Sequence, residues 1–264
     1  MIKEGRGPPV REAHVDAVLA KVPAVTLGFW IIKILATTLG ETGGDTLSMT
    51  YELGYLLSSV IFIVPLIVLV ITQVRALRFH PFLYWATIIA STTAGTTMAD
   101  LATRSLGIGY LGGSLLLLAC VVLTLALWRA ATGSIAMESI RSARAEMFYW
   151  VAITFSQTLG TALGDWAADD GGLGYLGGAG LFGALLLVLV LLWRFTAINR
   201  VALFWSAFVL TRPLGATVGD FLDKPLSQGG LDFSRPAASA VLVAAIILLI
   251  ALLPQRAAAL NAGH

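Results

Sequence analysis

Four aspartates stand at a fixed distance from four tryptophans, and these carboxylates are the first candidates for chemistry in the chain. Each aspartate follows a tryptophan by 15 residues, in the pairs Trp30 and Asp45, Trp85 and Asp100, Trp150 and Asp165, and Trp205 and Asp220. Because a helix rises about 1.5 Å per residue, each pair would span about 22 Å. Carboxylates from four equivalent helices would form a ring around a common axis, and such a ring attracts cations. We hypothesise a site for a hard metal ion such as Mg, Ca or Mn, with ligands from Glu41, Asp45, Asp100, Asp165 and Asp220.

The four copies differ at other positions, and these differences indicate where a single solute could bind. The third position after tryptophan is Lys33 in the first copy and is apolar in the other three. The seventh position is, in chain order, Thr37, Thr92, Gln157 and Arg212. The eleventh position is Glu41 in the first copy and threonine or alanine in the others. The expected binding residues for a solute or ion are therefore Lys33, Thr37, Glu41, Asp45, Asp100, Gln157, Asp165, Arg212 and Asp220.

Lys33 and Arg212 fall within apolar stretches, where a charge requires a partner. A charged lysine at the middle of a membrane costs about 2.5–3.5 kcal/mol on insertion scales. Glu41 lies two turns from Lys33 on the same helix, so we expect Lys33 to meet a carboxylate of another helix or to be neutral. Pro213 cannot donate a backbone hydrogen bond, so we expect the helix to break there, with Arg212 as a clamp for an anion or a carboxylate.

A purely structural role is an alternative for each of these groups. An aspartate next to a small residue near a helix end can bond a backbone group or a tyrosine hydroxyl and so close the turn. The hydroxyls available ten residues after an aspartate are those of Tyr55, Tyr110 and Tyr175. Lys33, Glu41 and Arg212 could equally form a buried charge network that only fixes the helix register.

The composition places these residues in a membrane protein. Of 264 residues, 58% are hydrophobic and 12% are charged, whereas soluble domains average roughly 45–50% and about 25%. The net charge of +2 and the single cysteine exclude a nucleic-acid binder and a disulfide scaffold. A membrane helix needs about 20 apolar residues, and eight such stretches occur, at 22–45, 55–74, 82–102, 110–129, 147–167, 175–194, 201–221 and 237–254.

The charges in the connecting segments predict the orientation. Basic residues gather before the odd-numbered stretches and after the even-numbered ones, and acidic residues gather at the opposite ends. By the positive-inside rule, both termini lie in the cytoplasm. We expect a multi-pass protein of the bacterial inner membrane, in which residues 1–21 form a cytoplasmic tail.

A two-helix unit is repeated four times. Glycine recurs in one frame at Gly40, Gly95, Gly160 and Gly215, and again nine residues after each aspartate. Trp30 to Trp150 and Trp85 to Trp205 are both 120 residues apart, which indicates two halves, 22–140 and 141–264. Each unit crosses the membrane twice, so the copies are parallel. The predicted fold is all-α, with eight transmembrane helices and the four odd-numbered ones inside.

The first copy carries the fullest motif. Its residues are Trp30, Lys33, Thr37, Thr38, Gly40, Glu41, Gly44 and Asp45. With its weaker echoes, this motif resembles a bacterial family of membrane proteins built from a repeat of unknown function. The resemblance covers nearly the whole chain beyond the N-terminal tail, and it implies no activity.

These features favour transport. No nucleotide-binding loop or catalytic triad is present, and His14, His80 and His264 all lie outside the expected spans, so we expect neither an enzyme nor a cofactor. The leading hypothesis is a proton-coupled secondary transporter of a small cation, including a divalent metal, along helices 1, 3, 5 and 7. A cation channel, an anion or organic-acid transporter and a membrane subunit that transports nothing are the alternatives. The expected partners are the solute and the lipid bilayer.

Overall fold

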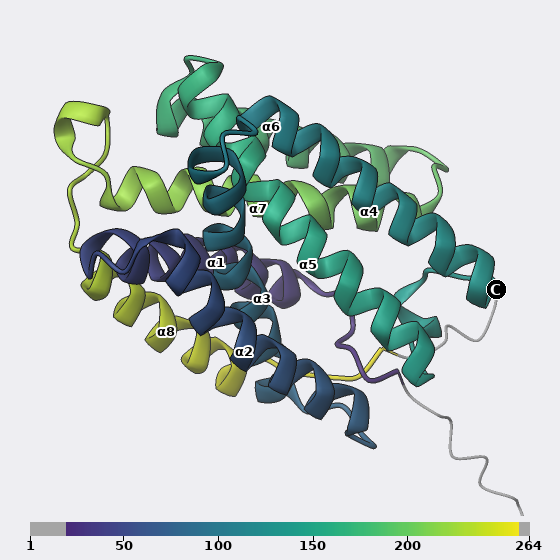
Figure 1. The fold of residues 1–264 in the computed structure, drawn as a ribbon. Coiled ribbons are helices and arrows are strands. Elements are labelled where there is room, and N and C mark those ends of the chain that lie inside the picture. The colour runs from purple at the N-terminus through teal and green to yellow at the C-terminus, as the bar shows by residue number, and fades with distance from the viewer. Residues whose placement is uncertain (1–19, 259–264) are drawn as a thin grey trace, which may run out of the picture.

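A computed structural model describes residues 20–258 of the chain, and this part is helical throughout its length apart from short connections (Figure 1). Eight long α-helices follow one another in sequence. They are α1 (Leu27–Asp45), α2 (Gly54–Arg75), α3 (Pro81–Asp100), α4 (Tyr110–Thr132), α5 (Ala143–Asp165), α6 (Gly174–Phe195), α7 (Arg200–Asp223) and α8 (Arg235–Leu252). Each of the eight expected apolar stretches therefore overlaps one helix over most of its length.

The first helix begins later than expected. Residues 22–26 were expected to be helical, but α1 starts at Leu27, where the Thr26 hydroxyl caps the helix by accepting a hydrogen bond from the Phe29 amide at 3.2 Å. The preceding segment is extended, and the Ala24 amide donates to the Arg256 carbonyl at 2.8 Å. Most of the expected cytoplasmic tail, residues 1–19, lies outside the described residues.

Five helices are long and apolar enough to cross a membrane by themselves: α2, α4, α6, α7 and α8. The helices α1, α3 and α5 fall short of that criterion because they carry many threonines, serines and acidic groups. Most of these polar side chains are buried inside the bundle rather than exposed on its outside. The chain is thus a helical protein with several membrane-like spans.

The four odd-numbered helices form a closed inner ring. α1 packs against α3, α3 against α5, α5 against α7, and α7 against α1. The even-numbered helices form an outer layer in which α2 covers α3, α4 covers α5 and α6 covers α7, while α8 returns to cover α1 (Figure 1). The second helix of each repeat therefore packs on the first helix of the next repeat, and the last repeat closes the ring onto the first.

Glycine permits the inner helices to approach one another closely. One glycine per repeat lies where the next inner helix presses against it, at Gly40, Gly95, Gly160 and Gly215. A β-carbon on Gly160 would overlap the Arg212 side chain, and a β-carbon on Gly215 would overlap Thr37. Small residues at such interfaces allow the backbones of membrane helices to approach closely.

A second glycine of each repeat turns the chain into the outer helix. Gly54, Gly109, Gly174 and Gly229 all have positive φ angles, of 70°, 74°, 63° and 83°. A side chain disfavours this left-handed backbone, which explains why glycine recurs nine residues after each aspartate. In the first three repeats a five-residue π-helical turn joins the aspartate to this bend, at Thr46–Thr50, Leu101–Ser105 and Trp166–Asp170.

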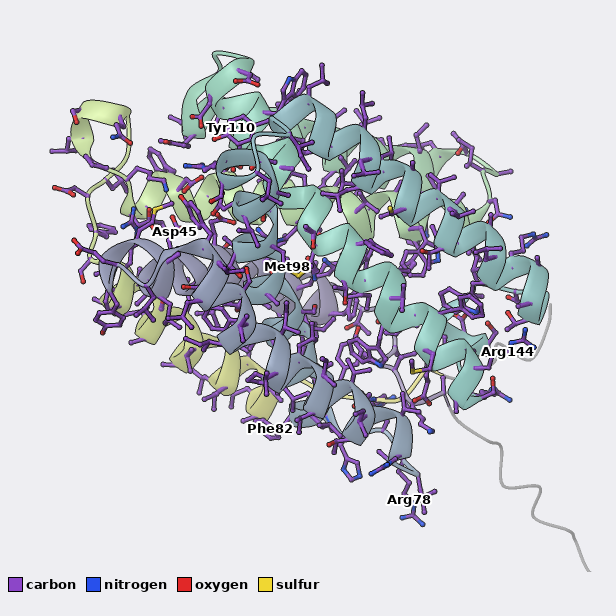
Figure 2. The ribbon with its side chains drawn as sticks, viewed as in Figure 1. Asp45, Arg78, Phe82, Met98, Tyr110 and Arg144 are labelled. Carbon is purple, nitrogen blue, oxygen red and sulfur yellow. The ribbon has the colours of Figure 1, made fainter. Side chains whose placement is uncertain are left out.

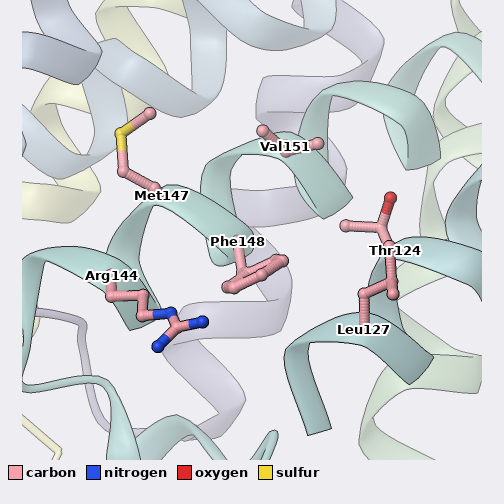
Figure 3. A pocket seen from close by; sticks show the side chains of 6 residues that line it. All are labelled: Thr124, Leu127, Arg144, Met147, Phe148 and Val151. Carbon is pink, nitrogen blue, oxygen red and sulfur yellow. The ribbon is translucent and has the colours of Figure 1, made fainter. Parts of the chain in front are cut away.

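A groove of about 360 Å³ lies between α4 and α5 on the outside of the bundle (Figure 3). Its lining is mostly apolar, and Leu127, Met147 and Val151 are each at least 40% exposed. The groove lies on the outer face of α5, whereas most polar residues of the repeats are buried inside the bundle.

Candidate functional site

The candidate site is the axis enclosed by α1, α3, α5 and α7. All four helices begin at one end of the bundle, which we call the aromatic end, and reach their motif aspartates at the other, the aspartate end. Figure 2 shows Asp45 and Tyr110 at the aspartate end, far from Arg78 and Arg144 at the aromatic end. Because the helices are parallel and in register, equivalent residues of the four repeats form successive layers along the axis.

The aromatic layer closes one end of the axis. The aromatic residue that precedes each tryptophan packs against the tryptophan of the next repeat, with ring centres 5.5–6.2 Å apart. The four pairs are Phe29 and Trp85, Tyr84 and Trp150, Tyr149 and Trp205, and Phe204 and Trp30. The hydroxyls of Tyr84 and Tyr149, both fully buried, lie 2.6 Å apart. Aromatic rings packed against one another therefore fill the aromatic end of the axis.

Arg212 of α7 donates hydrogen bonds to side chains of the other three inner helices. Its Nη2 atom donates to Glu41 Oε2 of α1 at 3.0 Å, and to the hydroxyls of Thr96 of α3 and Thr161 of α5 at 2.6 Å each. The arginine is 0% exposed, and Glu41 is 2% exposed. The three acceptors occupy the eleventh position of their repeats, so they form one layer around the guanidinium. The carboxylate that Arg212 contacts thus belongs to the protein itself.

The expected break at Pro213 is wrong. α7 runs without interruption from Arg200 to Asp223. A proline within a helix removes one backbone hydrogen bond, and the contacts of α7 with α1, α5 and α6 support the helix on both sides of that position.

Of the two expectations for Lys33, the structure shows no carboxylate partner in residues 20–258, and it does not test the neutral side chain. The Lys33 Nζ lies 3.8 Å from the centre of the Phe208 ring, within the range of a cation–π contact. The side chain is 0% exposed, and its Nζ has no hydrogen-bond partner in the described part of the chain. The expected carboxylate of another helix is thus replaced by an aromatic face.

The other residues of the seventh position are buried beside the axis. Thr37 donates to the Thr211 carbonyl of α7 at 3.2 Å, which joins the first repeat to the fourth. Gln157 is 0% exposed, and neither its amide nitrogen nor its amide oxygen has a partner among residues 20–258. The Thr92 hydroxyl is likewise buried and unpartnered in that range.

The four motif aspartates form two bridged pairs rather than one free ring. Arg104 contacts Asp100 at 2.9 Å and Asp165 at 3.2 Å. Lys224 contacts Asp45 at 2.8 Å and Asp220 at 3.0 Å. In both cases a basic side chain joins the aspartate of its own repeat to that of the next one. Within residues 20–258, each of these carboxylates forms an ion pair with a basic side chain, and none is hydrogen-bonded to the tyrosine that follows it.

Sequence reasoning missed these two basic residues, although the sequence holds a signal for them. Arg104 and Lys224 each follow the motif aspartate by four residues and are 120 residues apart, whereas the first and third copies have Met49 and Asp169 there. The basic residue thus recurs in every second repeat. Burial lowers the pKa of Lys224, but Asp220 and Asp45 raise it by more, so the pKa of Lys224 lies well above its ordinary value and the side chain is charged.

Three carboxylates are close enough to share a cation. Glu41, Asp45 and Asp220 each offer an oxygen within 4.8 Å of the others, and all three are buried. Of the five expected metal ligands, the structure therefore brings these three together, from the first and fourth repeats. Asp100 and Asp165 lie with Arg104 instead.

The repeats also match a known family. The sequence profile described as Repeat of Unknown Function (DUF347) matches the chain four times, at residues 28–79, 83–134, 148–199 and 203–256. Each match covers one inner helix and the outer helix that follows it. No curated protein and no solved structure matches the chain.

Proposed function

The chain belongs to this family of repeats, whose four matches cover most of its length, and we propose that it carries a small divalent metal cation across a membrane, in exchange for protons. The path in this proposal runs along the axis between α1, α3, α5 and α7.

All eight helices cross the membrane in this proposal. The inner helices α1, α3 and α5 are too polar to face lipid, but most of their polar side chains are buried in the bundle, and the apolar outer helices cover them. The aromatic end carries the basic connections that include Arg78, Arg129 and Arg141. By the positive-inside rule this end faces the cytoplasm, together with both termini, in a bacterial inner membrane.

The charge at the aspartate end is the observation that carries the proposal. Asp100 and Asp165 contact Arg104, Asp220 contacts Lys224, and Asp45 contacts both Lys224 and, at 3.8 Å, Arg235. Asp223 also lies there, but Arg235 pairs with it at 3.2 Å. At full ionisation these five aspartates face three basic side chains, so two negative charges are in excess, and a divalent cation would balance them. Glu41, Asp45 and Asp220 supply the oxygen ligands that Mg, Ca and Mn prefer.

The filled axis supports a carrier rather than an open channel. The aromatic layer occupies one end, and the Arg212–Glu41 pair crosses the middle with both side chains buried. An ion can pass only if the repeats move relative to one another, as in alternating access. Metal ligands must be deprotonated to bind, so release of the metal would leave the carboxylates free to take up protons.

Flux of Mn²⁺ into proteoliposomes, followed together with an internal pH dye, tests the proposal. We expect Asp45→Asn and Asp220→Asn to reduce the flux at least tenfold. Asp170→Asn, which neutralises an exposed aspartate at the same end, is the matched control and should not change it. Wild-type protein that neither binds nor moves Mn²⁺ or Ca²⁺ would refute the proposal. Single-channel currents would favour the channel alternative.

A further inference from the structure

We propose that a small monovalent anion binds on the axis between the aromatic layer and the Arg212–Glu41 pair, held by Lys33, Gln157 and Arg212. This site differs from the carboxylates at the aspartate end. The anion site does not depend on metal transport, because different residues form it and because they carry positive rather than negative charge.

The first observation is a group of buried polar atoms without partners. They are the Lys33 Nζ, the Gln157 amide, the Arg212 Nε and the Thr92 hydroxyl. All four side chains are 0% exposed. A buried donor without an acceptor loses the hydrogen bonds it would make with water, at a cost of about 1–3 kcal/mol for each group. Several such atoms in one region indicate that a ligand completes them.

The second observation is that these groups come from all four inner helices and belong to two successive layers, the third and seventh positions of the repeats. Thr92 lies one helical turn before Thr96, and Gln157 one turn before Thr161; both of these threonines accept from the Arg212 guanidinium. Side chains four residues apart lie on the same face of a helix. Thr92 and Gln157 therefore lie about 6 Å toward the aromatic end from the guanidinium contacts.

Lys33 of α1 belongs to the adjacent layer, one turn nearer the aromatic end. Its Nζ lies over the ring of Phe208, and Phe208 precedes Arg212 by one turn on α7. The ammonium is thus placed between the aromatic layer and the arginine. The cation–π contact supports its charge but satisfies none of its three N–H donors.

The charge of this region selects a monovalent anion. With Lys33 protonated, this region holds two positive groups, Lys33 and Arg212, and the carboxylate that contacts one of them in residues 20–258 is Glu41, which pairs with Arg212. One positive charge remains uncompensated in a region where the surrounding side chains exclude water. An anion that accepts hydrogen bonds from an ammonium, an amide and a guanidinium nitrogen would balance it. Chloride and the carboxylate of a short organic acid share this chemistry.

A neutral lysine is the competing explanation, because it would remove the excess charge with no ligand. The two explanations differ in what the purified protein binds. With an anion site, the full chain in detergent binds chloride or acetate saturably at constant ionic strength, whereas a neutral lysine predicts no saturable binding of either anion.

Calorimetric titration of the full chain with chloride and with acetate, against a gluconate background, tests the proposal. We expect Lys33→Met and Gln157→Leu each to weaken anion binding at least tenfold, and Arg78→Gln, which removes an exposed basic residue, to leave it unchanged. The tighter of the two anions identifies a halide or a carboxylate ligand.

Gln157→Leu changes no charge, so it keeps the proposal testable if Lys33→Met does not fold. Wild-type protein without saturable binding, or binding that survives both substitutions, would overturn it. Mn²⁺ binding measured on the same samples separates this site from the proposed metal site, because Lys33→Met should leave it within twofold of the wild type.

Discussion

The Arg212 guanidinium lies 3.0 Å from the Glu41 carboxylate, and this contact joins the last repeat of the chain to the first. The two residues are 171 positions apart in sequence. Neither residue has an equivalent of the same charge in the other repeats. This fully buried ion pair is therefore also a point at which the fourfold repetition is broken.

Removal of one member of this pair should destabilise the protein strongly. In Arg212→Met, Glu41 is left in a buried region without its partner, and such losses cost about 3–5 kcal/mol. The double substitution Arg212→Met with Glu41→Gln should cost less than the sum of the two single changes. Unfolding of all four proteins in mixed detergent micelles gives this coupling. Strictly additive losses would show that the contact contributes nothing to stability.

The tightly packed glycines should not tolerate a methyl group. Gly160→Ala would place a β-carbon on the Arg212 side chain, so we expect a loss of stability of about 1–3 kcal/mol from overpacking. Gly180→Ala on the outer helix α6 is the matched control, since no atom lies within 4 Å of its β-carbon. The control should be neutral or slightly stabilising. Equal thermal stability of the two variants would contradict the packing described here.

The two buried tyrosine hydroxyls should act as one unit. Tyr84→Phe removes one partner of the 2.6 Å contact and leaves the Tyr149 hydroxyl unsatisfied, at a cost of about 1–3 kcal/mol. The double change to phenylalanine removes both hydroxyls, so it should be more stable than at least one of the single variants. Thermal unfolding of the three variants tests this. A double variant less stable than both single ones would mean that the hydroxyls have other partners.

Lys224 should compete with a bound metal ion. It lies 2.8 Å from Asp45 and 3.0 Å from Asp220, two of the three clustered carboxylates. Lys224→Gln leaves a further negative charge uncompensated, so we expect at least tenfold tighter binding of Mn²⁺ by calorimetry. Arg104→Gln is the informative comparison, because Arg104 serves the pair outside the cluster and its loss should have a smaller effect. Unchanged or weaker binding in Lys224→Gln would contradict the proposed site.

Hydropathy and repetition predicted most of the fold. Apolar stretches of the length of a membrane located all eight helices, because polar or glycine-rich segments separate them along the chain. The family of repeats and the all-helical class are confirmed. The start of the first helix was misplaced because an extended apolar segment before Thr26 has the same hydropathy as a helix.

The contacts of the site were harder to predict, since they depend on neighbours that the sequence does not place. Lys33 lies over Phe208 rather than beside a carboxylate, and nothing in the spacing of α1 indicates that α7 offers an aromatic ring at that height. Arg104 and Lys224 do not appear in a pattern shared by all four repeats, because a basic residue stands at this position only in the second and fourth copies.

The return of α8 onto α1 fixes the number of repeats. In an open stack of repeats the two end units each have one uncovered face, so units can be gained or lost with little change to the others. Here every unit has a neighbour on both sides, and adding or deleting one would require a new angle at every interface. Evolution of such a chain can change the side chains of single copies much more readily than their number.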